Sequence, residues 1–259
     1  MAAAPAVPAG MDCIWTRPQS MHDRAFHFCP GCGHSLAHRL VCEVIDELGI
    51  EQTTIGAGPV GCAWNPFHYI NVDFVYCLHG RAPAVATGMK RAHPDKVVFT
   101  YQGDGDLASI GMAEIVHAAA RSEKISVVFV NNGVFGMTGA QMAPTSLVGQ
   151  VTSTSPLGRD PNLAGFPIRV AEFLAQLDGV SYAERCALDS PANIRRAKVA
   201  IKKVFQNQLD GYGFSIVELL SPCPEGWHMP PEDARVWLRE QMAKQHPLGK
   251  IKDLTVGGK

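Results

Sequence analysis

The chain has 259 residues, 46% of them hydrophobic, and a formal net charge of -1. This composition provides a sizeable core, and the near-neutral charge argues against a nucleic-acid partner. No apolar run reaches the roughly 20 residues that span a bilayer, so we expect no membrane partner. Eight cysteines without a recognisable secretory signal indicate a reducing compartment, and hence a cytoplasmic protein.

The first predicted element is a flexible N-terminal tail over residues 1–20, which opens with alanine and proline. Next comes a Cys29-Pro-Gly-Cys32 turn, which bends two thiols toward one point. A helix should follow, with Ser35 as its N-cap, an apolar stripe at helical spacing and Gly49 at its end.

The Cys-x2-Cys motif has four interpretations when it is considered alone: half a zinc site, a thioredoxin-like dithiol, half an iron–sulfur site, or two structural cysteines in a turn. Two further cysteines lie in loops just after predicted strands. Cys62 follows the strand 53–55, and Cys223 follows the strand Phe214–Leu220. Together with Cys29 and Cys32, they are enough for a cubane cluster. The sequence predicts small buried side chains for Cys42, Cys77 and Cys186, and places Cys13 in the N-terminal region.

His79-Gly-Arg81 precedes a helix predicted over residues 84–92. At a helix start, this arrangement can place an imidazole and a guanidinium beside an anion. The alternative is a loop histidine with a solvated arginine.

The centre of the chain is predicted to be strand, glycine turn, helix and strand. The strand 97–101 leads into Gly103-Asp-Gly-Asp106, a helix covers residues 107–121, and the strand 125–130 ends at Asn131-Asn132. In a parallel sheet both polar ends lie at the same edge, where ligands bind.

Oxygen ligands at this edge suit Mg²⁺ bound to a diphosphate. Asp104 supplies a carboxylate, Asn132 an amide oxygen and Val134 a carbonyl, while Gly103 and Gly105 allow close approach of phosphate. The spacing between the acidic turn and the paired asparagines resembles that of thiamine diphosphate enzymes.

The polar stretch from residue 133 to about residue 167 lacks periodicity, and we expect a functional loop over the cofactor. The sequence then predicts a helix over 170–177, a strand over 180–185, a helix opened by Ser190-Pro191 and a last helix over 231–244. The predicted fold is α/β, a mostly parallel sheet flanked by helices. One domain over 21–228 should precede a C-terminal helix and tail over 229–259.

The order of these motifs resembles the β subunit of 2-oxoacid:ferredoxin oxidoreductases, the thiamine-diphosphate-binding subunit. The resemblance rests on Cys-Pro-Gly-Cys-Gly-His (29–34), Gly-Pro-Val-Gly-Cys (58–62), His-Gly-Arg-Ala-Pro-Ala (79–84), Gly-Asp-Gly-Asp (103–106), Asn-Asn (131–132) and Ser-Pro-Cys-Pro (221–224). The segments Gln-Met-Ala-Pro-Thr (141–145), Gly-Arg-Asp-Pro (158–161) and 163–170 are similar to the 2-oxoisovalerate, or branched-chain, group.

The resemblance implies three cofactors. A [4Fe-4S] cluster would be held by Cys29, Cys32, Cys62 and Cys223, and Mg²⁺ by Asp104, Asn132 and Val134. Thiamine diphosphate would contact Val60, Gly61, Cys62, Ala63, His79, Gly105, Asp106, Gly136 and Met137. His79, Arg81 and Cys62 would be catalytic.

The implied activity is oxidative decarboxylation of a 2-oxoacid to acyl-CoA and CO2, with electrons passed through the cluster to ferredoxin in anaerobic metabolism. Glu114 is poorly placed to activate thiamine. An α subunit, with γ and δ subunits separate or fused, would supply that glutamate and the contacts to coenzyme A and substrate. The chain alone should be inactive.

The residues after Cys62, Ala-Trp-Asn-Pro-Phe, include no cation that would neutralise a second substrate carboxylate. This favours 2-oxoisovalerate or another apolar 2-oxoacid. The alternatives are a pyruvate- or 2-oxoglutarate-specific member, a non-redox thiamine diphosphate decarboxylase or carboligase subunit, and a zinc-bound scaffold subunit.

Overall fold

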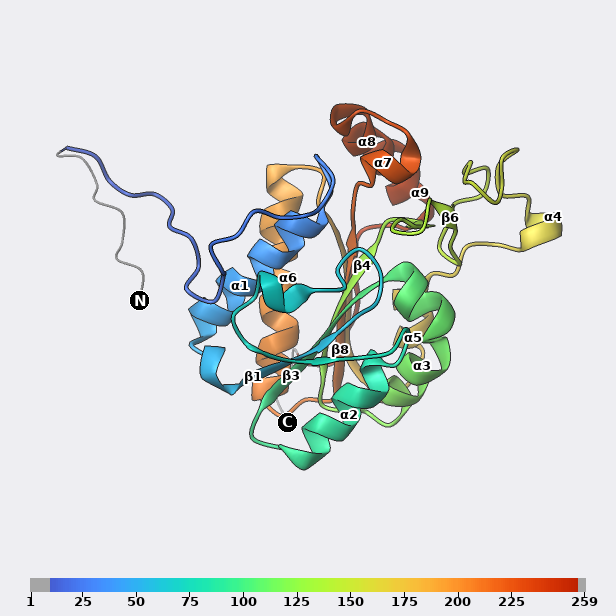
Figure 1. The fold of residues 1–259 in the computed structure, drawn as a ribbon. Coiled ribbons are helices and arrows are strands. Elements are labelled where there is room, and N and C mark those ends of the chain that lie inside the picture. The colour runs from blue at the N-terminus through green and yellow to red at the C-terminus, as the bar shows by residue number, and fades with distance from the viewer. Residues whose placement is uncertain (1–9, 256–259) are drawn as a thin grey trace.

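Seven strands form the central sheet in the computed structural model, which describes residues 10–255 (Figure 1). The strand order is β2-β1-β3-β4-β8-β7-β9, and all neighbours are parallel except β7 and β9. The strands are β1 (Thr54–Gly58), β2 (Asp73–Tyr76), β3 (Val97–Gly103), β4 (Ser126–Asn131), β7 (Val180–Ala187), β8 (Phe214–Leu220) and β9 (Gly249–Asp253). This confirms the predicted mostly parallel α/β sheet.

Helices cover both faces of the sheet (Figure 1). One face carries α1 (His34–Leu48) and α6 (Pro191–Leu209), and the other carries α2 (Ala82–Ala92), α3 (Met112–Ala120) and α5 (Val170–Ala175). Successive side chains of a strand point to opposite faces, so Phe99 packs in the α1–α6 layer and Val98 in the α2–α3–α5 layer. Both faces are buried, which explains why β3 and β4 are continuous apolar runs.

The remaining elements are short and lie in the connections. They are the 3-10 helices η1 (Glu51–Thr53) and η2 (Pro66–His68), the hairpin strands β5 (Val134–Phe135) and β6 (Gln141–Met142), and the helices α4 (Pro161–Ala164), α7 (Pro224–Trp227), α8 (Pro231–Trp237) and α9 (Ala243–Gln245). Two π-helices complete the set: η3 (Gly105–Ile110) and η4 (Leu238–Met242). None of the helices between residues 10 and 255 is both long and apolar enough to cross a bilayer.

The helices α1 and α3 both begin at a different residue from the one predicted. Ser35 is not the N-cap of α1, because the helix already begins at His34 and the Ser35 hydroxyl donates to the Cys32 carbonyl. Gly49 ends α1 in the left-handed conformation, as predicted. The single helix predicted over 107–121 is two helices, η3 and α3, joined at Gly111. A Cβ on Gly111 would lie 2.6 Å from the Gly80 carbonyl oxygen, so only glycine permits this close approach.

The two chain ends hold more structure than the sequence suggested. The predicted C-terminal helix is present as α8, η4 and α9, but the predicted tail contains β9, an edge strand with little hydrophobic pattern and two lysines. At the other end, residues 1–9 lie outside the described residues. Ser20 is buried and its backbone N–H donates to Asp46 in α1. The predicted division of the chain into a tail, one domain and a C-terminal segment, with boundaries at residues 20 and 228, stays a prediction.

A buried ion pair joins the centres of β7 and β8. Arg185 Nη2 lies 2.9 Å from Glu218 Oε2, and both side chains are completely buried. The other Glu218 oxygen accepts a hydrogen bond of 2.7 Å from Asn131 Nδ2 at the end of β4. This pair therefore ties three neighbouring strands together beneath the functional edge of the sheet.

Replacing Glu218 with alanine is expected to lower the free energy of unfolding by about 1–3 kcal/mol, because Asn131 Nδ2 and part of the buried Arg185 guanidinium lose their partner while Glu172 still pairs with Arg185. Urea denaturation measures the loss. Glu232→Ala is the matched control, since this exposed carboxylate lies 3.8 Å from Arg235 and should change stability by less than about 1 kcal/mol. Equal losses in both variants would contradict the proposed importance of the buried pair.

Candidate active site

Two adjoining cavities lie where the loops after β1, β3, β4 and β8 meet. We call the first, of about 110 Å³, the carboxylate cavity, because Asp104 and Asp106 line it. All the residues predicted to contact the cofactor also line it: Val60, Gly61, Cys62, Ala63, His79, Gly105, Asp106, Gly136 and Met137. The parallel sheet thus brings together loops that are far apart in the sequence.

Asp104, Asn132 and Val134 lie together in the carboxylate cavity. The Asp104 carboxylate is almost fully buried and accepts hydrogen bonds from the Gly105 N–H (2.9 Å) and the Thr145 hydroxyl (2.8 Å). Burial raises its pKa to about 6 despite these hydrogen bonds. The Asn132 amide oxygen accepts one hydrogen bond, from the Val134 N–H. Lone pairs remain on both side chains, so this set of oxygens suits Mg²⁺.

Gly105 is required at the bottom of this cavity by close packing. A Cβ there would lie 2.4 Å from the ring of Phe135 in β5. The absence of a side chain lets the β5–β6 hairpin close against the end of β3. The predicted role of Gly105 beside a phosphate is therefore accompanied by a packing role.

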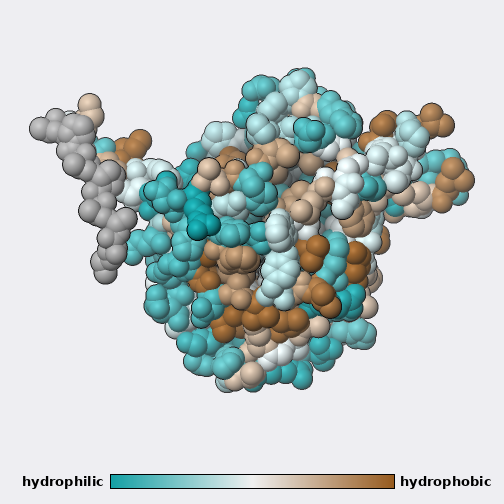
Figure 2. Space-filling view, in the orientation of Figure 1, coloured by the Kyte–Doolittle hydropathy of each residue, from teal (hydrophilic) through white to brown (hydrophobic). Residues whose placement is uncertain are grey.

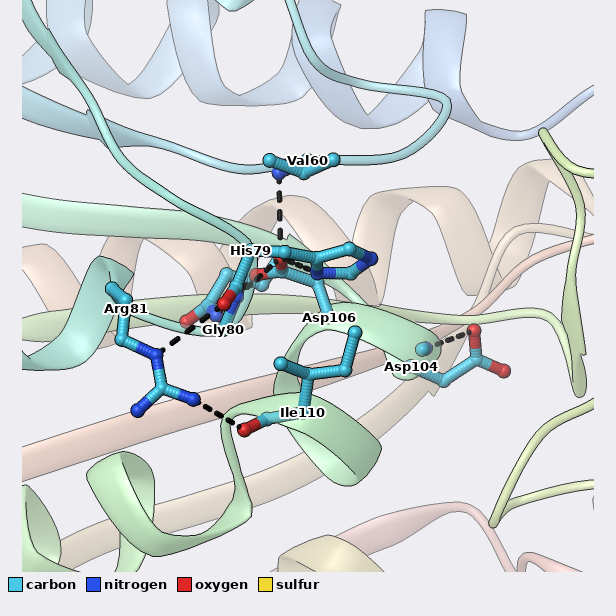
Figure 3. A network of polar contacts seen from close by, with 9 residues as sticks. Val60, His79, Gly80, Arg81, Asp104, Asp106 and Ile110 are labelled. Carbon is cyan, nitrogen blue, oxygen red and sulfur yellow. Dashed lines mark hydrogen bonds and ion pairs between the residues drawn. The ribbon is translucent and has the colours of Figure 1, made fainter.

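Asp106 also lines the carboxylate cavity, and its carboxylate accepts hydrogen bonds from neighbouring residues of the chain. Figure 3 shows Val60, His79 and Gly80 converging on its carboxylate. Its Oδ1 accepts hydrogen bonds from the Val60 N–H (3.3 Å), the Gly80 N–H (2.9 Å) and His79 Nδ1 (2.5 Å), and its Oδ2 accepts one from Gln102 Nε2 (2.6 Å). A carboxylate only accepts, so Nδ1 of His79 carries the proton and Nε2 remains free. Asp106 thus fixes the orientation of the His79 ring in the wall of the carboxylate cavity.

Arg81 is not brought to the carboxylate cavity with His79. Its guanidinium forms an ion pair with Glu114 and donates to the Ile110 carbonyl at 2.8 Å. Both contacts hold the start of α2 against η3 and α3. The anion site expected at His79-Gly-Arg81 therefore contains the imidazole and lacks the guanidinium.

The second cavity, of about 270 Å³, is lined by Cys29, Cys32, Cys62 and Cys223, and we call it the cysteine cavity. A Cβ on Gly136 would lie 3.3 Å from Cys62 Sγ and 3.6 Å from Cys223 Sγ, so the two sulfurs are close neighbours. Burial raises the pKa of Cys32 and Cys223 to about 12 and that of Cys62 to about 11, and neighbouring thiols contribute to each shift.

The four thiols surround the cavity instead of meeting at one point. Within residues 10–255, no three His, Cys, Asp or Glu side chains are arranged to share a single metal ion. A zinc ion needs its sulfur ligands at about 2.3 Å. Sulfurs spread around a cavity suit a larger group with several metal atoms, such as an iron–sulfur cluster.

Glycine and proline bring the two ends of the chain together at the cysteine cavity. A Cβ on Gly31 would lie 2.6 Å from the Pro231 side chain, and one on Gly33 would lie 2.4 Å from the Ser221 hydroxyl. The Gly33 N–H donates to the Pro222 carbonyl. The loop that carries Cys29 and Cys32 therefore packs directly against the loop that carries Cys223.

The two cavities share a wall. Cys62, Asn132, Gly136 and Met137 line both of them. Cys42, Cys77 and Cys186 are buried elsewhere, as the sequence predicted, and Cys13 is exposed. Groups bound in the two cavities would thus be separated only by the residues of this shared wall.

His34 and Thr145 are among the residues of the site that were not predicted. His34 lines the carboxylate cavity, hydrogen-bonds the Tyr101 hydroxyl through Nδ1 (2.9 Å), and has its pKa lowered to about 3 by burial, so it is neutral. Its only signal was its position directly after the Cys-Pro-Gly-Cys-Gly motif. Thr145, which binds Asp104, lies in an aperiodic loop where the sequence gives no sign of its partner.

Comparison with known proteins agrees with this geometry. Residues 57–219 match the family described as thiamine pyrophosphate enzyme, C-terminal TPP binding domain. The chain is 48% identical over 247 residues to ketoisovalerate oxidoreductase subunit VorA of Methanothermobacter thermautotrophicus, covering 92% of this chain and 52% of that protein. It is 33% identical over 240 residues to 2-oxoglutarate synthase subunit KorB of Methanocaldococcus jannaschii, covering 90% and 83%. The chain thus spans about half the length of VorA.

The fold is similar to that of a solved structure, 2-oxoglutarate:ferredoxin oxidoreductase from Magnetococcus marinus with 2-oxoglutarate, coenzyme A and succinyl-CoA bound. The TM-score is 0.74 at 23% sequence identity, and the match covers 93% of this chain and 86% of the other. At this identity the likeness concerns the fold.

Proposed function

Since the chain belongs to the thiamine pyrophosphate enzymes and, within them, to the 2-oxoacid:ferredoxin oxidoreductase subunits, we propose that it binds Mg²⁺, thiamine diphosphate and a [4Fe-4S] cluster. With a partner subunit it would convert a 2-oxoacid and coenzyme A to acyl-CoA and CO2 and pass the electrons to ferredoxin. The observation that carries this proposal is the shared wall between the carboxylate cavity and the cysteine cavity.

Asp104, Asn132 and the Val134 carbonyl would hold Mg²⁺, and Cys29, Cys32, Cys62 and Cys223 would hold the cluster. When bound, thiamine diphosphate supplies the decarboxylation chemistry and the cluster supplies a one-electron acceptor. The chain's own residues orient these groups. Asp106 fixes the tautomer of His79 so that Nε2 is free toward a ligand, and Cys62 lies between the two cavities.

Arg81 would act as a positioning residue, because its contacts with Glu114 and Ile110 fix the segment that carries His79. Val134 and Met137 give the carboxylate cavity an apolar wall beside the oxygen ligands. Such a wall excludes water from the reacting atoms and strengthens the electrostatic interactions there.

An apolar 2-oxoacid such as 2-oxoisovalerate fits the lining of the site best. Within the described residues, neither cavity has a lysine or arginine in its lining. Burying a second substrate carboxylate without a cation is costly. The segment after Cys62 instead provides Trp64 and Phe67, both with exposed aromatic side chains.

A partner subunit would complete the cofactor site. The carboxylate cavity of about 110 Å³ is smaller than the roughly 300 Å³ at which ligand pockets begin, and within the described residues no glutamate lines it. A projecting segment around α4 carries exposed Leu157, Leu163 and Phe166, and Figure 2 shows hydrophobic side chains at its outer end. Apolar side chains that are exposed together are typical of protein–protein contacts. All eight cysteines are unpaired, which supports a cytoplasmic, reducing environment.

Anaerobic co-expression with the partner subunits tests the proposal. The purified complex is expected to contain about four irons per copy of this chain, since one cubane cluster has four. It should reduce a redox dye only when both a 2-oxoacid and coenzyme A are present, and it should prefer 2-oxoisovalerate to 2-oxoglutarate. The chain alone should show no activity. Free aldehyde or a hydroxyketone as the product, with no need for iron, would refute the proposal.

A further inference from the structure

The segment 143–168, which we call the arm, joins β6 to α5 and contains α4. In Figure 1 it extends away from the sheet around α4. Its outer residues Leu157 and Leu163 are almost completely exposed. The inner part, by contrast, contains buried polar side chains, among them Thr145, Ser146 and Arg159.

Arg159 fixes the conformation of the arm. Its guanidinium is buried, and its five N–H groups lie within hydrogen-bond distance of six main-chain carbonyls, with Nη1 shared among three of them. Three of these carbonyls belong to the start of the arm: Ala143 (3.3 Å), Pro144 (3.0 Å) and Ser146 (2.8 Å). The other three belong to its return: Ala164 (3.0 Å), Gly165 (2.9 Å) and Phe166 (2.9 Å). One side chain therefore joins both ends of the arm.

The start of the arm contacts both sides of the proposed metal site. The Thr145 hydroxyl donates to Asp104 Oδ2 at 2.8 Å. The Ser146 hydroxyl donates to the Gly133 carbonyl at 2.5 Å, and Gln150 Nε2 donates to the same carbonyl at 3.1 Å. Gly133 lies between Asn132 and Val134. The arm thus holds the aspartate after β3 and the asparagine loop after β4 relative to each other.

We propose that Arg159 is a positioning residue for the Mg²⁺–diphosphate site, acting through the arm and chiefly through Thr145. This inference rests on the proposed function. Residues behind a metal ligand orient its lone pairs, and their loss typically lowers metal affinity 10–100-fold. Here Thr145 orients the ligand Asp104, and Arg159 would in turn orient Thr145 by holding the carbonyls of Pro144 and Ser146. Arg159 itself does not contact the metal ligands.

Lysine cannot replace Arg159 in this role. The guanidinium presents five N–H groups in a rigid planar fork, so it reaches the carbonyls at both ends of the arm at once. An ammonium group is a single point with three donors. Arg159→Lys keeps the charge and most of the volume, but it would leave at least one end of the arm without its hydrogen bonds.

The test measures thiamine diphosphate binding by calorimetry at graded Mg²⁺ concentrations, on the complex purified with its partner subunits. Arg159→Lys is expected to raise the Mg²⁺ concentration for half-maximal binding about tenfold, and Thr145→Val by a similar factor. Thr145→Ser keeps the hydroxyl and should behave as wild type. Arg169→Lys, at the exposed arginine that directly follows the arm, is the matched control and should change nothing.

The double variant separates positioning from a general structural role. If Arg159 acts through Thr145, Arg159→Lys/Thr145→Val should require about tenfold more Mg²⁺, close to either single variant, whereas independent effects would multiply to about 100-fold. Iron content should be unchanged, and hydrogen exchange should increase within the arm in Arg159→Lys.

Three results would overturn the inference: a wild-type Mg²⁺ requirement in Arg159→Lys, a multiplicative double variant, or a parallel loss of iron and thermal stability. If the wild-type complex itself binds no thiamine diphosphate, the proposed function fails first. A failure of the proposed function is therefore seen in the wild type, whereas a failure of the inference about Arg159 is seen only in the variants.

Discussion

Replacing Asp104 with alanine is expected to weaken the binding of Mg²⁺–thiamine diphosphate by at least about 100-fold while the iron content stays at the wild-type level. Loss of a group that merely orients a metal ligand costs 10–100-fold, and loss of a ligand should cost no less. Asp104 lines the carboxylate cavity and is absent from the lining of the cysteine cavity. Calorimetry with thiamine diphosphate, together with iron analysis of the same sample, measures both quantities.

Asp106→Ala provides an informative comparison, because Asp106 lies two residues away but binds Val60, His79, Gly80 and Gln102. Its loss should disorder the loops that carry Val60 and His79, whereas Asp104→Ala removes only the contacts to Gly105 and Thr145. Full cofactor affinity in Asp104→Ala would show that the metal assignment is wrong.

The same aspartate has a consequence for the stability of the metal-free protein. Burial raises the pKa of Asp104 from 3.8 to about 6, so the folded state holds this proton more tightly than the unfolded state does. Stability is therefore lost as the pH rises from about 4 to 6, by up to about 3 kcal/mol for a shift of this size. Asp104→Asn cannot ionise. In the presence of a chelator it should be more stable than wild type at pH 7 and lose this advantage at pH 4.

Replacing Cys223 with alanine is expected to remove the cluster and to spare thiamine diphosphate binding at least in part, whereas Cys62→Ala should damage both. The reason is their placement: Cys223 lines the cysteine cavity alone, while Cys62 lines both cavities. A cubane cluster that loses one of four thiolates is exposed to loss of iron. Iron and sulfide analysis measures the cluster, and calorimetry measures cofactor binding.

Cys186→Ala is the control for both variants, because Cys186 is a buried cysteine, as Cys223 is, but lies in β7 outside both cavities. It should keep iron and cofactor at wild-type levels. Wild-type iron content in Cys223→Ala would show that Cys223 is not a cluster ligand. Unchanged cofactor binding in Cys62→Ala would contradict the prediction that Cys62 contacts both bound groups.

The sequence predicted the parallel core and the edge that carries the site for a local physical reason. Strands buried on both faces must be apolar throughout, and such runs as Val97–Tyr101 and Phe214–Leu220 end abruptly in Gly-Asp-Gly or Ser-Pro-Cys-Pro. Since parallel strands share one carboxyl edge, the residues that follow them must meet there. Cys62, Cys223 and the Asp104–Asn132 pair were predictable on these grounds, whereas Cys29 and Cys32 precede α1 and were predicted from the Cys-x2-Cys motif. The strand β9 was not, because a short edge strand needs little hydrophobic pattern.

The sequence by itself thus determined which segments meet, through strand periodicity and through the glycines and prolines that shape the loops between them. Only the tertiary structure decided what each polar side chain does at the meeting point. Asp106 accepts a hydrogen bond from His79, Arg81 pairs with Glu114, and Thr145, which lies in the arm that Arg159 fixes, donates to Asp104. Hydrogen bonds and ion pairs depend on distances of a few tenths of an ångström between groups far apart in the chain, and no local pattern of residues encodes those distances.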